Sequence, residues 1–216
     1  MHEMRVKRAV AVAVAAIVAS ALTAAPASAH GKTKPLGTKS LAAVLTADKS
    51  GFDRKSGDYD ILTAAVLAVL KAKPASPVAV LTDGKTALTA FIPNDRAFET
   101  LVADIQHTKR LPGEKAAFTA VAGLGIDTVE SVLLYHVVPG ATIDRKAALK
   151  ADGASLKTAA GSAVKVDVRG FCWKRVTLID ADRSDRDPRV ITFDVNKGNR
   201  QIAHGIDRVL RPIDLP

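Results

Sequence analysis

The apolar residues of this chain follow a helical spacing in its first half and a strand-like spacing in its second. Between residues 41 and 135 they recur every three or four positions, which places them on one face of a helix. Between residues 155 and 210 they form short runs rich in branched side chains. Helices followed by strands are typical of an α+β domain. We therefore predict an α+β domain, with two small sheets packed face to face or as a wedge and the N-terminal helices laid against them.

The helices are expected where the helical spacing is clearest, at residues 41–45, 61–70, 94–102, 114–121 and 128–135. Asp60 can cap the second helix, and Pro74 stops it because proline cannot continue a helix. The side-chain oxygens of Asn94 or Asp95 can accept from free backbone amides at the start of the third. A Gly-Leu-Gly segment separates the last two helices.

The strands are expected at residues 155–158, 164–168, 176–179, 190–195, 200–204 and 206–210. Near the C-terminus, Ile202, His204 and Ile206 alternate with Ala, Gly and Asp, the pattern of a strand with one inward face. Gly205 is expected to mark a β-bulge or a close backbone approach.

The first 29 residues carry the pattern of a secretory signal peptide. Three cations at residues 5–8 precede the apolar run Ala9–Leu22, and Ala27-Ser28-Ala29 supplies small residues for cleavage. The run is Ala-rich and shorter than the ~20 strongly apolar residues that a membrane-spanning helix needs. We expect an exported mature chain that starts at His30, is secreted or associated with the cell envelope, and has no membrane span.

The mature chain is predicted to form one basic domain. It divides into a flexible N-terminal segment, the domain and a C-terminal tail, at residues 30–38, 39–212 and 213–216. Loss of three Lys/Arg and one Glu with the signal peptide lowers the formal charge from +9 to +7. The cations are dispersed and few aromatic side chains accompany them, so we expect no nucleic-acid binding. Attraction to an anionic envelope is the favoured use of the charge.

Three apolar segments carry polar residues in a characteristic order. They are Phe91–Phe98, Leu133–Gly140 and Ile202–Pro212. These segments resemble the first box, the Tyr-His box and the second box of the fasciclin (FAS1) domain, a secreted or surface-displayed adhesion and binding module. The resemblance covers roughly residues 39–212. It implies two small sheets with helices packed against them, and a binding function.

The resemblance also implies candidate partner contacts. Tyr135 and His136 match paired residues that are implicated in receptor adhesion in some animal relatives. The full set is Asn94, Asp95, Tyr135, His136, His204 and Asp207. The family usually has Thr or Ser in place of Asn94, and most relatives have a branched residue in place of Gly205.

A structural role is the alternative for the same residues. A His between apolar neighbours commonly bonds backbone groups, a hydroxyl or a carboxylate. His136, His204, Asp95 and Asp207 can be pictured as one buried polar cluster, and such groups usually satisfy one another. Asp207 is expected to accept from backbone amides or from Arg208.

No motif of a catalytic site is present in the sequence. It lacks Gly-x-Ser-x-Gly, His-Glu-x-x-His, a phosphate-binding loop and a Cys-His pair at metal spacing. We predict a non-catalytic, monomeric module without a cofactor that binds an extracellular or envelope protein or glycan. A secreted hydrolase acting on envelope material and a homophilic or structural module are the alternatives.

Two acidic stretches raise the question of calcium binding. The first contains Asp48, Asp53, Asp58 and Asp60, and the second contains Asp180, Asp182, Asp185 and Asp187. Neither follows the EF-hand order. Arginines at positions 183, 186 and 189 are expected to pair with the second set. Solvated loops or helix caps are the favoured account, and the first set is the calcium candidate.

Cys172 is the only cysteine, which excludes an internal disulfide. It lies within the apolar segment Phe171–Trp173, which favours a buried thiol. A reactive thiol or an intermolecular disulfide is the alternative.

Overall fold

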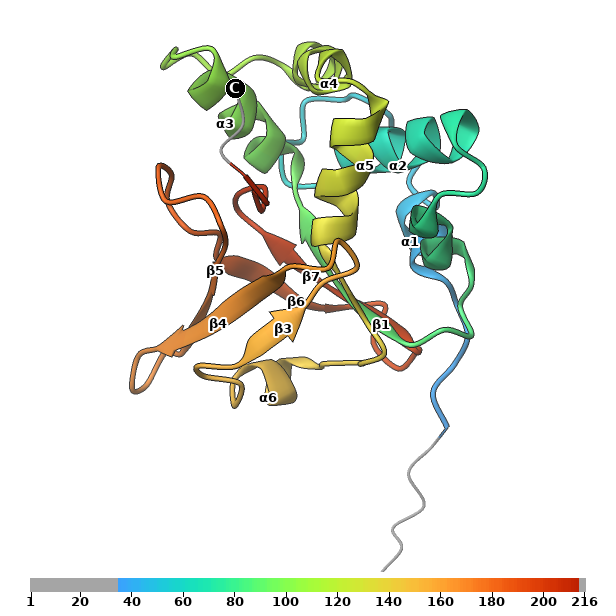
Figure 1. The fold of residues 1–216 in the computed structure, drawn as a ribbon, viewed down its shortest axis with the longest axis vertical. Coiled ribbons are helices and arrows are strands. Elements are labelled where there is room, and N and C mark those ends of the chain that lie inside the picture. The colour runs from blue at the N-terminus through green and yellow to red at the C-terminus, as the bar shows by residue number, and fades with distance from the viewer. Residues whose placement is uncertain (1–34, 214–216) are drawn as a thin grey trace, which may run out of the picture. The chain divides into compact units, whose positions relative to one another are not determined.

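The computed structural model describes residues 35–213 (Figure 1). The predicted signal peptide, residues 30–34 of the predicted N-terminal segment and residues 214–216 lie outside the described part. The helices are α1 (Leu41–Leu45), α2 (Asp60–Ala72), the 3-10 helix η1 (Pro77–Thr82), α3 (Asp95–Ile105), α4 (Glu114–Gly123), α5 (Ile126–Tyr135) and α6 (Arg145–Ala148). The five predicted helices are present, and η1 and α6 were not predicted.

Seven strands within the described residues form two sheets. They are β1 (Leu88–Pro93), β2 (Val137–Pro139), β3 (Ser155–Lys157), β4 (Ala163–Arg169), β5 (Arg175–Ile179), β6 (Val190–Val195) and β7 (Gln201–Ile206). The four-stranded sheet has the order β2-β1-β7-β6, with β1 and β7 parallel. The three-stranded sheet has the order β3-β4-β5 and is antiparallel. The predicted α+β class with two small sheets and N-terminal helices is confirmed.

The four-stranded sheet separates two hydrophobic cores. Leu88, Ala90 and Ile92 of β1 belong to the core shared with helices α1–α5. Phe91, from the opposite face of β1, belongs to the core shared with β4 and β5. Because side chains alternate along a strand, β1 serves both cores at once, and its six residues are all buried.

The last strand differs from its prediction in two ways. All six residues of β7 are buried, because the helices cover one face and the second sheet covers the other, so it does not have a single inward face. It also ends at Ile206, and the strand predicted at 206–210 is absent. The expectation for Gly205 is confirmed: a Cβ there would lie 2.4 Å from the Tyr59 hydroxyl, and the β6–β7 register shifts beside it.

The caps of two helices come from residues of the first box. Asn94 caps α3 as predicted, and its side chain accepts from the Ala97 amide at 3.0 Å. The prediction that Asp60 caps α2 is wrong, because Asp60 is the first residue of the helix and its side chain makes no capping bond. Asp95 caps α2 instead, since its two carboxylate oxygens accept from the amides of Asp60 and Ile61 at 3.1 and 2.8 Å.

No single helix of the described part is long and apolar enough to cross a bilayer; α4 and α5 meet the length and composition criteria only together, as a pair bent by 107°.

Candidate functional site

The two box histidines lie in the interior and bond only backbone groups among the described contacts. The His136 Nε2 accepts from the Leu210 amide at 2.9 Å, so its Nδ1–H donates to the Val132 carbonyl at 2.7 Å. His204 uses the opposite tautomer: Nδ1 accepts from the Asp194 amide at 3.2 Å and Nε2–H donates to the Ile143 carbonyl at 2.8 Å. Burial lowers the pKa of His136 to about 4 and also lowers the pKa of His204. Both rings therefore stay neutral and join segments far apart in the chain.

The other predicted contact residues are also mostly buried. Asn94, Asp95 and Tyr135 are buried, and Tyr135 donates its hydroxyl to the Ala163 carbonyl at 3.3 Å. Asp207 is half-buried and accepts from the Arg189 amide at 2.7 Å and from the Arg186 guanidinium at 3.1 Å. A direct partner contact through these residues stays a prediction, and their burial favours the structural alternative.

The residues pictured as one polar cluster occupy separate places. No hydrogen bond among the described residues joins His136, His204, Asp95 and Asp207 to one another. Asp207 accepts from a backbone amide as predicted, but its charged partner is Arg186 and not Arg208.

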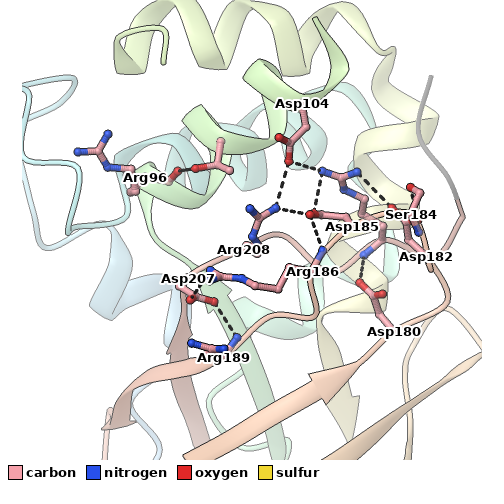
Figure 2. Close-up of polar contacts among 12 residues, drawn as sticks. Arg96, Asp104, Asp180, Asp182, Ser184, Asp185, Arg186, Arg189, Asp207 and Arg208 are labelled. Carbon is pink, nitrogen blue, oxygen red and sulfur yellow. Dashed lines mark hydrogen bonds and ion pairs between the residues drawn. The ribbon is translucent and has the colours of Figure 1, made fainter. Parts of the chain in front are cut away.

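A network of charges joins α3 to the segments that follow β5 and β7 (Figure 2). The buried Arg211 guanidinium contacts Asp182 and Asp185 at 3.1 Å and Asp104 at 3.2 Å. Arg208 contacts Asp104 at 3.1 Å and also contacts Asp185. The second acidic stretch is paired with arginines, but the prediction that Arg183, Arg186 and Arg189 supply them is wrong. Among the described residues, the guanidinium groups that contact this stretch come from Arg208 and Arg211 of the C-terminal segment. These contacts fix three chain segments together.

The turn between β4 and β5 has a geometry that only glycine fits at its first position. The two strands pair from Lys165–Ile179 to Arg169–Arg175, which leaves residues 170–174 as the turn. Gly170 has φ +105°, in the region that favours glycine, and a Cβ there would lie 2.3 Å from the Trp173 carbonyl oxygen. The inward side chains of both strands are buried in the core beneath, so the turn extends from a hairpin that is packed on the core.

Two large apolar side chains stand in solvent at this turn. Phe171 is 98% exposed and Trp173 is 88% exposed, whereas the next most exposed large apolar residue of the described part, Ile213, is 62% exposed. Cys172 between them is exposed, so the prediction of a buried thiol is wrong. Arg169, Lys174 and Arg175 flank the aromatic residues and are exposed. We call residues 169–175 the aromatic turn; in Figure 1 it lies at the end of the β4–β5 hairpin, away from α2–α5.

The comparison with known sequences decides the family. Residues 62–212, more than half of the chain, match the profile of the fasciclin domain. The chain belongs to the fasciclin family. Fasciclin domains are generally non-catalytic adhesion modules and are typically extracellular. The resemblance found in the three segments is confirmed.

One solved structure shows how the fasciclin domain compares with a relative. The chain is similar to a FAS1 domain pair from the insect cell adhesion molecule Fasciclin I, with 18% sequence identity and a TM-score of 0.45. The match covers 68% of this chain and 44% of the domain pair, so the chain spans less than half of that protein's length. No curated protein sequence matches the chain.

The sequence reasoning missed the aromatic turn of this fasciclin domain. The apolar character of its residues predicts burial, because apolar side chains are usually buried. The signal was present in the order of residues, since Gly170 and the flanking cations separate Phe171 and Trp173 from the alternating apolar residues of both predicted strands.

The calcium candidates fall into two groups. Asp48 and Asp53 lie in exposed turns, where they accept from the backbone amides of Ser50 and Lys55 at 2.9 Å. Asp58 and Asp60 lie deeper, beside Asp95 at the start of α2. Asp48 and Asp53 therefore already accept hydrogen bonds from nearby amides, whereas Asp58 and Asp60 lie beside another carboxylate.

Proposed function

We propose that this fasciclin domain is a secreted, non-catalytic binding module that recognises a protein or glycan at the cell envelope or in the extracellular matrix. The observation that carries the proposal is the exposure of Phe171 and Trp173 together on a hairpin that is packed on the core. Buried aromatic anchors supply much of the affinity of protein interfaces, and Trp is especially enriched among them. The family's role in adhesion supports the same conclusion.

The chemistry of the aromatic turn indicates what it can bind. Removing the two side chains from water on binding is worth about 1.5–3 kcal/mol each. Arg169, Lys174 and Arg175 add positive charge beside them, although Arg169 is partly neutralised by Asp167 at 2.7 Å. The turn therefore suits an acidic surface that offers an apolar recess or the flat face of a sugar ring.

Binding of defined probes to the mature chain tests this proposal. Heparin, hyaluronan, collagen and fibronectin are immobilised, and binding is measured by biolayer interferometry in reducing buffer. We expect at least one probe to bind, and the double variant Phe171→Ser/Trp173→Ser to lose at least about tenfold in affinity. The control Leu67→Ser/Ile191→Ser removes two apolar side chains that are each 51% exposed elsewhere, and it should bind as the unmodified chain does.

Equal binding by the two double variants would contradict the assignment of the aromatic turn. Turnover in esterase, peptidase or glycosidase assays would support the hydrolase alternative. Self-association that rises with protein concentration in sedimentation, and that the Phe171→Ser/Trp173→Ser variant abolishes, would support the homophilic alternative.

A further inference from the structure

Five carboxylates gather where helices α2 and α4 begin. Oxygen atoms of Asp53, Asp60 and Glu114 lie within 4.8 Å of one another, and the same holds for Asp58, Asp60 and Asp95. Asp60 belongs to both groups, so it joins them into one acidic cluster. Glu114, the first residue of α4, comes from a part of the chain that the sequence analysis did not connect with the first acidic stretch.

Four oxygens of this cluster are buried without a hydrogen-bond donor. They are Asp58 Oδ1, Asp60 Oδ2 and both carboxylate oxygens of Glu114. Glu114 is 4% exposed and Asp60 is 8% exposed. Within residues 35–213, every buried carboxylate oxygen that lacks a donor is one of these four. Native proteins rarely leave buried polar atoms unsatisfied, because each costs about 1–3 kcal/mol and a charged group costs more.

The free amides at the start of α2 do not satisfy these oxygens. The first-turn amides of α2 at Asp60 and Ile61 are already bonded by Asp95. Asp60 Oδ2 and both oxygens of the Glu114 carboxylate therefore lack a donor among the described residues.

No cationic side chain among the described residues forms an ion pair with Asp60 or Glu114. Lys55 contacts Asp53 at the rim, but it is an exposed side chain and forms no ion pair with Asp60 or Glu114. A cavity of about 320 Å³ is lined by Asp48, Asp58 and Asp60 and can admit water to the cluster. A ligand set made only of oxygens, partly on a loop, suits Ca²⁺, which takes six to eight oxygens in flexible geometry, better than Mg²⁺, which needs a near-ideal octahedron.

We propose that this acidic cluster binds one calcium ion between Asp60 and Glu114, with Asp53 and Asp58 completing the protein ligands and water filling the remaining positions. Asp95 positions Asp60 by holding its amide. The ion would join the loop before α2 to the start of α4. The expected dissociation constant is about 10⁻⁴–10⁻³ M, the range of extracellular calcium modules. This site is separate from the aromatic turn and does not depend on the function proposed for it.

Calorimetry and thermal unfolding of the metal-free mature chain test the site just above neutral pH. We expect one Ca²⁺ per chain, and a Tm that rises by about 3–5 °C when the Ca²⁺ concentration is about ten times the dissociation constant. Glu114→Gln should have two opposite effects. It should raise the Tm without Ca²⁺, because it removes a buried unpaired charge, and it should abolish the rise with Ca²⁺. Glu130→Gln, at a Glu of α5 that pairs with Lys73, is the matched control and should keep the full rise.

Three results would overturn the site. They are a wild-type Tm that does not respond to Ca²⁺, a response that Glu114→Gln retains, and an equal response to Mg²⁺ or to NaCl at the same ionic strength. If Glu114→Gln does not fold, Asp53→Asn at the exposed rim replaces it. That variant should weaken Ca²⁺ binding about tenfold, and unchanged binding would count against the proposal.

Discussion

The histidines inside the boxes and the aromatic side chains of the turn lie in opposite environments. His136 and His204 are polar groups in an apolar interior, and each ring nitrogen has a backbone partner. Phe171 and Trp173 are apolar groups in water, and they stand almost fully exposed. The hydrogen-bonding groups of the two histidine rings are all used within the fold, whereas the two aromatic side chains contribute little to the fold.

This difference separates the side chains that stabilise the fold from those that we propose bind a partner. Side chains whose bonding capacity is already used are costly to remove and have little left to offer a partner. Exposed aromatic side chains cost little to remove from the free protein but gain when a partner buries them. We therefore predict large stability losses for interior changes and small ones for changes in the aromatic turn.

The largest loss of stability is expected for a substitution in the charge network that holds the C-terminal segment. Arg211→Met should destabilise the protein by about 3–5 kcal/mol, because it leaves the buried Asp182 without its charged partner. Arg186→Met is the control, since the Arg186 side chain is 52% exposed and, within the described part, forms an ion pair only with Asp207. This change should cost less than about 1 kcal/mol. Urea unfolding measures both. Equal losses of unfolding free energy for the two variants would show that burial of the arginine does not determine the cost of replacing it.

A smaller loss, with a defined pH dependence, is expected at His136. His136→Leu removes the acceptor of the buried Leu210 amide and should cost about 1–3 kcal/mol at neutral pH. The pKa of His136 is about 4 in the folded protein, against 6.5 for an unperturbed histidine, so protonation favours unfolding and its contribution is lost as pH falls below 6.5. Between about pH 7 and pH 5, His136 should lower the free energy of unfolding by about 2 kcal/mol.

Comparing the pH dependence of stability among variants separates the contribution of His136 from that of other titrating groups. His136→Leu should lose less stability than the unmodified protein over this pH range. His107→Leu, at an exposed position after α3, should lose as much as the unmodified protein. Parallel pH profiles for all three proteins would contradict a neutral, buried His136.

Gly170→Ala should cost about 1–3 kcal/mol, because φ is +105° and the added Cβ meets the Trp173 carbonyl. Gly161→Ala is the control, since φ is +91° but nothing lies within 4 Å of the added Cβ. Thermal unfolding should show the greater loss for Gly170→Ala, and circular dichroism in the aromatic region should change for that variant alone. Equal effects would indicate a turn looser than the one described.

The smallest effect on stability is expected at the aromatic turn itself. Phe171→Ser/Trp173→Ser should change the free energy of unfolding by no more than about 0.5 kcal/mol for each substitution, because the side chains make few contacts with the rest of the protein. Urea unfolding under reducing conditions gives the value. A loss of several kcal/mol would place the two rings in the core and remove the contrast on which the account rests.

Local features of the fold could be predicted from the sequence because their causes lie close together in the chain. The helix after Asn94 and the break between α4 and α5 both follow from one residue and its neighbours. Long-range contacts could not be predicted in this way. The cap of α2 comes from Asp95, 35 residues after Asp60, and Arg211 bonds Asp104 across 107 residues.

The candidate site was harder to predict than the fold, for a related reason. Apolar character predicts burial for Phe171 and Trp173, whereas the pairing of β4 with β5 shows that they occupy a turn beyond the core. Likewise, the cluster at Asp60 depends on the meeting of α2 with α4, which no spacing in the sequence reveals.

Trp173 is the only tryptophan of the chain, so its fluorescence reports on the aromatic turn alone. In the free mature protein we expect the emission of an indole in water, with full access to acrylamide and iodide. Addition of the probe that binds most tightly should shift the emission to shorter wavelength and protect the indole from both quenchers. An indole already shielded in the free protein, or one that stays open to quenchers in the saturated complex, would contradict recognition through the aromatic turn.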